Sequence, residues 1–183
     1  MLDSESHSRW ICIKHRPTTS TLITIPTTRL SYDFPTFFLS NTRSTANKLD
    51  EISVTITNNK YDIAIITGSW LSSNITNDLI NIPAFLIIRK DRCDDQRVGG
   101  LCTYIRNTLD FLELKDLSHP DIESQWFLIK PKRLPRGIDA IVIASVYHPP
   151  QNNNRTLRNH LFESLDNALA NFLNAGIVLL GGL

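Results

Sequence analysis

The chain has 183 residues, 42% of them hydrophobic and 20% charged, which is enough for one domain with a substantial core and short for two. The formal net charge of +1 excludes a uniformly basic nucleic-acid-binding protein, so any contacts with phosphate would have to be concentrated locally. The odd number of cysteines, three, argues against a disulfide framework, and no apolar run approaches the roughly 20 residues of a membrane-spanning helix.

The N-terminal segment, residues 1–33, differs from the rest of the chain in composition. Six threonines lie between positions 18 and 28, prolines at positions 17 and 26 interrupt the segment, and no useful helical or strand period is present. We predict a disordered, threonine-rich leader, with an added edge strand through residues 22–25 as the alternative. The folded domain is expected over residues 34–183.

The first part of the folded domain has the pattern of a strand, a helix and a second strand. Residues 37–39 form a short apolar run that ends at Ser40 and Asn41. Apolar residues then recur at helical spacing at positions 46, 49, 52 and 56, after a predicted N-cap at Ser44 or Thr45. A second strand is predicted over residues 62–67. This order favours a parallel pair of strands joined by a crossover helix.

The remainder of the chain is predicted to be rich in strands. Apolar and β-branched runs predict strands over residues 83–88, 101–105, 111–114, 125–129, 138–147 and 177–180. An amphipathic helix whose apolar face runs from Leu157 to Phe172 precedes the last of them. Trp70 and Trp126 are expected in the core.

The segment with the clearest functional pattern is YDIAIITGSWL, residues 61–71. A buried strand here runs directly into a short polar turn, and a strand end is a common place for chemistry because the sheet fixes whatever lies there. The residue at this strand end is Gly68, which has no side chain.

Five segments, taken in order, carry a family resemblance. They are FFLSNTRSTANKLDE at 37–51, DIAIITGSWL at 62–71, RKDRCDDQRVGGLCTYIR at 89–106, IVIASVYHPP at 141–150 and GIVLLGGL at 176–183. Together they resemble the endonuclease domain of non-LTR retrotransposons, which precedes a reverse transcriptase and belongs to the endonuclease/exonuclease/phosphatase superfamily. The resemblance implies an α+β fold, the DNase I-like four-layer α/β sandwich, of which this chain would be the N-terminal portion.

The resemblance also implies a chemistry and two site residues. Members of the family hydrolyse phosphodiesters with a hard divalent cation, normally Mg²⁺, on oxygen ligands. Asn41 occupies the place of a site asparagine at the end of the first strand, and Tyr147 that of a tyrosine that contacts the phosphate region. On residue type alone, Asn41 could equally be a turn residue and Tyr147 an ordinary aromatic at a strand end. His148 is expected to be a loop residue.

The sequence departs from the family pattern at the metal-binding positions. Relatives carry a glutamate, the principal metal ligand, where this chain has Gly68. Relatives end the late strand with Gly-Asp-Phe-Asn, whereas this chain reads Gly-Gly-Leu, so either Gly182 or Leu183 replaces the aspartate. We therefore expect Asn41 and Tyr147 to be vestigial, no metal to be held by this chain, and the later Asp, Asn and His of relatives to be absent.

Three functions are consistent with this sequence. The first is a remnant of a metal-dependent DNA endonuclease without working chemistry. The second is a fragment that binds nucleic acid without cleaving it, with DNA as a weak partner or none and no membrane partner. The third is a phosphoesterase of the same superfamily acting on lipid or sugar phosphates. The basic residues considered for nucleic-acid binding are Arg43, Lys48, Arg89 and Arg92, with Lys90, Lys132 and Arg133.

Overall fold

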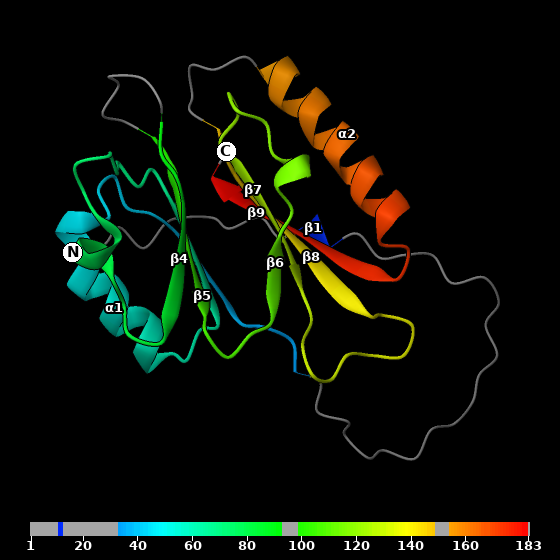
Figure 1. Cartoon of the computed structure of the whole chain (residues 1–183), viewed down its shortest axis with the longest axis horizontal. Helices are drawn as coiled ribbons and strands as arrows, with labels where there is room; N and C mark the ends of the chain where they lie inside the picture. The colour runs from blue at the N-terminus through cyan, green and yellow to red at the C-terminus, as the bar shows by residue number, and fades with distance from the viewer. Residues whose placement is uncertain (1–10, 13–32, 93–98, 149–153, 183) are drawn as a thin grey trace.

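A computed structural model describes residues 11–12, 33–92, 99–148 and 154–182 of the chain, folded as two sheets and two helices (Figure 1). The first sheet has the order β2-β3-β5-β4, from β2 (Phe37–Asn41), β3 (Ile63–Thr67), β4 (Phe85–Lys90) and β5 (Leu101–Arg106). The second has the order β1-β9-β8-β7-β6, from β1 (Ile11–Cys12), β6 (Phe111–Glu113), β7 (Ser124–Ile129), β8 (Ala140–Tyr147) and β9 (Ala175–Gly182). The helices are α1 (Leu49–Asn58) and α2 (Asn154–Asn171).

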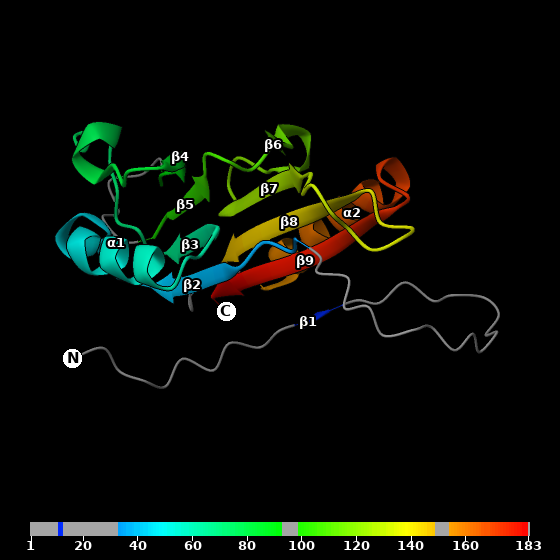
Figure 2. The same cartoon turned by 90° about the horizontal axis from the view of Figure 1, so that it is seen from below.

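The two sheets pack face to face and each carries one helix on its outer side (Figure 2). In β3, Ile63 and Ile65 face the core between the sheets, while Ala64 and Ile66 pack toward α1. This follows from the two-residue period of a strand, which turns successive side chains to opposite faces. On the second sheet, Trp126 of β7 packs in the cluster that contains Ala168 of α2. The four-layer sandwich is therefore confirmed.

Both helices are crossovers between parallel strands. β2 and β3 are parallel neighbours joined through α1, and β8 and β9 are parallel neighbours joined through α2. The register pairs Asn41 with Thr67 in the first sheet and Tyr147 with Gly182 in the second. Parallel pairing brings the carboxyl ends of the strands in each pair to the same edge of its sheet.

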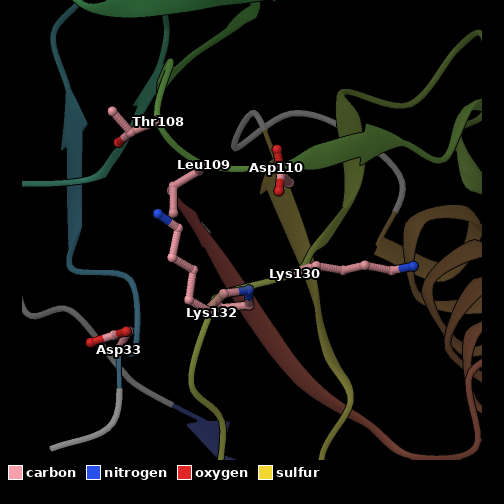
Figure 3. A pocket seen from close by; sticks show the side chains of 7 residues that line it. Asp33, Thr108, Leu109, Asp110, Lys130 and Lys132 are labelled. Carbon is pink, nitrogen blue, oxygen red and sulfur yellow. The ribbon is translucent and has the colours of Figure 1, made fainter.

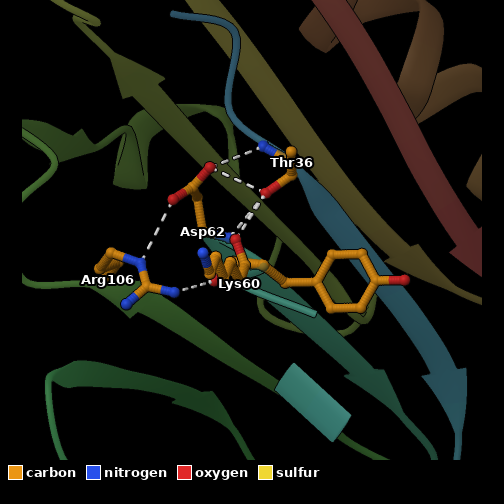
Figure 4. A network of polar contacts seen from close by, with 5 residues as sticks. Thr36, Lys60, Asp62 and Arg106 are labelled. Carbon is orange, nitrogen blue, oxygen red and sulfur yellow. Dashed lines mark hydrogen bonds and ion pairs between the residues drawn. The ribbon is translucent and has the colours of Figure 1, made fainter. Parts of the chain in front are cut away.

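A polar network fixes the opposite end of the first sheet (Figure 4). The Asp62 carboxylate accepts hydrogen bonds from the Thr36 amide at 2.9 Å and the Thr36 hydroxyl at 2.8 Å. Arg106 pairs with the other carboxylate oxygen at 3.2 Å and donates to the carbonyl of Tyr61 at 2.7 Å. These contacts join the segments that enter β2 and β3 to the end of β5, and so support the register that sets the strand ends.

Two local expectations, for Thr45 and Trp70, differ from the structure. Thr45 does not cap α1: it precedes a 3₁₀ turn, Ala46–Lys48, its side chain makes no capping bond, and α1 begins at Leu49. Trp126 is buried as expected, but Trp70 is 38% exposed, because it lies in a tight turn with a positive φ of 52°. Residues 11–12 of the predicted leader pair antiparallel with β9. The rest of residues 1–32, including 22–25, lies outside the described residues.

A histidine pair anchors α2 to the segment before β7. Ser124 Oγ lies 3.2 Å from Nε2 of His160, and Ser164 Oγ lies 3.4 Å from its Nδ1. The His119 ring packs edge-on at 5.5 Å from the His160 ring. Burial, then the positive charges of His119 and Lys90, lower the pKa of His160 from its ordinary 6.5, and Glu163 opposes them.

Within the described ranges, no helix is long and apolar enough to span a bilayer.

The His119–His160 pair is expected to make the protein less stable in acid. A lowered pKa in the folded state means that the unfolded chain binds the proton first, so the free energy of unfolding falls as the pH drops below 6.5 and is unaffected at pH 8. Urea unfolding of His160→Gln should show a shallower decrease between pH 7 and pH 5 than the wild type. An equal slope in the two proteins would contradict the assignment to His160.

Candidate active site

The ends of β2 and β3 bring Asn41 and Gly68 together. Asn41 pairs with Thr67, and the amide of Thr42 donates to the Thr67 carbonyl at 3.2 Å. A β-carbon at position 68 would lie 2.6 Å from Oδ1 of Asn41. Any side chain at position 68 would therefore project into the space that the Asn41 amide now occupies, so the two positions share one site.

Backbone contacts fix the turn that contains Gly68. Ser69 donates from its amide to the Gly100 carbonyl at 3.2 Å, and Trp70 donates to the Gly99 carbonyl at 2.8 Å. A β-carbon on Gly100 would lie 2.7 Å from Ser69 Oγ, so this close approach requires a glycine at position 100. Gly68 itself has a φ of +59°, which costs an L-residue about 1–2 kcal/mol.

The ends of β8 and β9 reach the same edge from the second sheet. His148 donates from its amide to the Gly182 carbonyl at 3.0 Å. A β-carbon on Gly182 would lie 3.2 Å from Thr67 Oγ1 and 3.5 Å from Cδ2 of Tyr147. Position 182 thus lies between the end of β3 and the Tyr147 ring. The structure gathers Asn41, Gly68, Tyr147 and Gly182 around Thr67, whereas Leu183 lies outside the described residues.

The donors at this edge do not fit a hard divalent cation. They are the Asn41 amide and the hydroxyls of Thr67 and Tyr147, with no carboxylate among them. Mg²⁺ in proteins is normally held by one or two carboxylates. Among the described residues, no group of three or more His, Cys, Asp or Glu side chains is placed to hold a metal ion. We therefore derive no metal-dependent step for this site.

Sequence reasoning missed a buried carboxylate beside this edge, that of Glu123. It is 8% exposed, accepts a hydrogen bond from the Gly100 amide at 2.5 Å, and lies 2.7 Å from Nε of Arg92. Its carbonyl accepts from the Tyr147 amide at 2.9 Å. Burial raises the pKa of Glu123, while Arg92 and the Gly100 amide oppose that shift. Glu123 therefore links the Gly100 backbone to the end of β8.

No local pattern marks Glu123 in the sequence. It follows Ile122 and precedes the buried strand β7, where a charged residue is normally read as part of a solvated loop. Its two partners, Gly100 and Arg92, are 23 and 31 positions away, and only the fold brings them to the carboxylate.

The basic residues considered for nucleic-acid binding occupy different environments. Arg89 is mostly buried, pairs with Asp91, and donates to the carbonyls of Ile75 and Ser72. Arg92 pairs with Glu123. Arg43 is exposed, Lys48 is half-buried, and Lys90 donates to the His119 carbonyl. Two of the four principal candidates thus have carboxylate partners within the domain, which reduces the charge they offer to phosphate.

A separate hollow of about 200 Å³ lies at the opposite end of the second sheet, where β6 begins and β7 ends (Figure 3). Lys130 and Lys132 line it together with Asp33 and Asp110. The hollow carries charges of both signs. Because it lies at the opposite end of the second sheet, Lys132 is distant from the edge that carries Asn41 and Tyr147. Arg133 belongs to the same region, since its carbonyl accepts from the Asp33 amide at 3.0 Å.

Comparison with solved structures identifies the fold. The endonuclease domain of TRAS1, a telomere-specific non-LTR retrotransposon, is 12% identical with a TM-score of 0.55, over 79% of this chain and 57% of that one. The human Nocturnin catalytic domain with bound sulfate is 10% identical with a TM-score of 0.57, over 96% and 66%. The Xenopus laevis APE2 catalytic domain is 10% identical with a TM-score of 0.52, over 79% and 57%.

The chain therefore has the DNase I-like fold of endonuclease/exonuclease/phosphatase proteins, as the resemblance implied. It spans 57% to 66% of the length of these three structures. No protein-family model matches the sequence, and no curated protein is similar to it at a significant level. At identities of 10% to 12%, the likeness establishes the architecture and leaves the activity to be argued from the site.

Proposed function

We propose that this chain is a remnant of a metal-dependent DNA endonuclease of the non-LTR retrotransposon kind, and that it does not by itself hydrolyse phosphodiesters. The observation that carries the proposal is Gly68, which follows β3 and whose missing side chain would point at Asn41 at the end of β2. The resemblance implies a metal-binding glutamate at this position. The likeness to the TRAS1 domain supports the descent.

The residues that remain at the edge can bind but cannot complete the reaction. The Asn41 amide and the Tyr147 hydroxyl can donate hydrogen bonds to phosphate oxygens. Hydrolysis also requires charge neutralisation at phosphate and a group that orients the attacking water. Because catalytic groups of this kind act as a unit, losing the carboxylate ligands lowers the rate by several orders of magnitude.

The same reasoning makes DNA at most a weak partner of this chain. Exposed Arg43 follows Asn41 by two residues, and its amide would lie 3.8 Å from a β-carbon at position 68, so one basic residue borders the edge. Arg89 and Arg92 are paired with Asp91 and Glu123 and add little net charge. A phosphoesterase acting on lipid or sugar phosphates would require the same missing carboxylates.

Restoring carboxylates at the edge is expected to create a cation site. In Gly68→Glu/Gly182→Asp, one side chain would project toward Asn41 and the other toward Thr67 and Tyr147. We expect this variant to bind Tb³⁺, measured by luminescence sensitised through Tyr147, and to release it on addition of excess Mg²⁺. The wild type and Gly68→Glu alone should bind Tb³⁺ much more weakly, because they bring fewer carboxylates to the edge than the double variant does.

A matched control adds a carboxylate elsewhere. Gly137 also has a positive φ, 84°, and a β-carbon there would have no neighbour within 4 Å, so Gly137→Glu adds charge without building a site. Terbium luminescence in this control equal to that of the double variant would argue against a restored site. Plasmid nicking by the wild type with Mg²⁺ that disappears in Tyr147→Phe would contradict the proposed inactivity directly.

A further inference from the structure

Helix α2 presents an apolar stripe to solvent in addition to the face that it buries. Leu157, Ser164 and Ala168 are buried against the second sheet. Phe162 and Leu169, seven residues apart and therefore on one face of the helix, are 60% and 46% exposed. Figure 1 shows α2 at the periphery of the molecule, with the sheet on one side of it. Phe162 and Leu169 together give this face of α2 exposed apolar area that a partner could cover.

Two opposite charges flank Phe162 on the same face. Arg158 precedes it by four residues and Asp166 follows it by four, and both are exposed. Side chains four apart on a helix are neighbours. Along the stripe the order is therefore positive, apolar and negative, centred on Phe162, and Leu169 lies beyond Asp166.

This order is complementary to itself when two helices run antiparallel. If the two-fold axis passes at Phe162, Arg158 of each copy lies opposite Asp166 of the other, and the two Phe162 rings meet at the centre. A parallel pair would instead place like charges opposite each other. An interface in which the same patch serves both partners is the usual form of a two-fold dimer.

We infer that a second copy of this chain docks on α2, antiparallel, through the two Phe162 side chains and the reciprocal Arg158–Asp166 pairs. One helix face per partner is a small interface, so the dimer is reversible and weakens with salt. The inference is independent of the proposed loss of hydrolysis, because it uses no residue of the Asn41–Tyr147 edge.

The test is the oligomeric state of the full chain, measured by sedimentation equilibrium over a range of concentrations. The wild type should move from monomer toward dimer as concentration rises. Arg158→Asp and Asp166→Arg should each weaken dimerisation by about tenfold or more, because each places like charges opposite one another twice. The double variant Arg158→Asp/Asp166→Arg should restore dimerisation. Because both residues are exposed, these changes leave the core intact.

A hydrophobic pair of variants gives an independent readout. Phe162→Ser should abolish the dimer. Val54→Ser should leave it unchanged, since Val54 is an exposed apolar residue on α1 that lies between Asp50 and Asn58 at the same spacing, without an opposite-charge pair. A chain that stays monomeric at all concentrations overturns the inference. So does a dimer that survives both single charge reversals, or association beyond the dimer that the charge swap does not affect.

Discussion

Replacing Glu123 with alanine is expected to lower the free energy of unfolding by about 3 kcal/mol, at the low end of what breaking a buried ion pair costs. The variant leaves the guanidinium of Arg92 without its carboxylate and the Gly100 amide without its acceptor. The low end of the range applies because Arg92 can still reach water, its side chain being 22% exposed. The measurement is urea unfolding at neutral pH, followed by circular dichroism.

A surface pair provides the control for this experiment. Glu113 and Lys115 are 3.9 Å apart and the Lys115 side chain is 81% exposed, so Glu113→Ala should change stability by about 0.5 kcal/mol or less. Glu123→Gln should fall between the two, because its amide oxygen can still accept from the Gly100 amide while the charge pairing with Arg92 is lost. Equal effects for Glu123→Ala and Glu113→Ala would show that Glu123 has no special role in joining Gly100 to β8.

Adding a single methyl group at Gly181 is expected to cost about 3 kcal/mol, the upper part of the usual range for overpacking. A β-carbon there would lie 2.3 Å from the Val146 carbonyl oxygen and 3.2 Å from its carbonyl carbon. Both atoms belong to the backbone of β8, which pairs with β9 at this position, so neither can move aside as a side chain end would. The end of β9 must shift, and Gly182 is displaced from Thr67 and Tyr147.

The same strand supplies the matched control. A β-carbon on Gly176 would make an ordinary contact of 3.9 Å with Cγ2 of Ile138. Gly176→Ala should therefore be neutral or stabilise by about 0.5 kcal/mol, because alanine reduces the freedom of the unfolded chain. Thermal unfolding of the two variants should separate them clearly. A Gly181→Ala protein as stable as Gly176→Ala would mean that β8 and β9 are not so closely apposed at this edge.

These two predictions describe one structural feature. The edge that carries Asn41 and Tyr147 is held by close backbone approaches at Gly100 and Gly181 and by the buried Glu123 carboxylate, not by ligand side chains. Such a frame does not depend on a side chain at position 68 or position 182. The DNase I-like architecture therefore does not require carboxylates at positions 68 and 182.

Much of the fold was predictable because it depends on local patterns. The alternation in β3 separates Ile63 and Ile65 from Ala64 and Ile66, and the helical spacing of apolar residues predicted both helices. The parallel β2–β3 pair followed from the strand, helix, strand order. The start of α1 was misplaced, because Thr45 donates its amide to the Ser69 carbonyl, a contact 24 positions away that no local rule includes.

Local patterns were enough to place both helices and the longer strands, and to identify the positions at the strand ends, including the glycine at position 68. Strand period, helix spacing and residue identity are all local properties. The packing of distant segments sets what surrounds that glycine: the Asn41 amide, the Gly99–Gly100 backbone and, through Thr67, the end of β9. It also decided that Trp70 is exposed and that Glu123 and Arg89 are held by internal partners. Each of these outcomes depends on contacts between distant segments of the chain. Those contacts form only when the two sheets pack together.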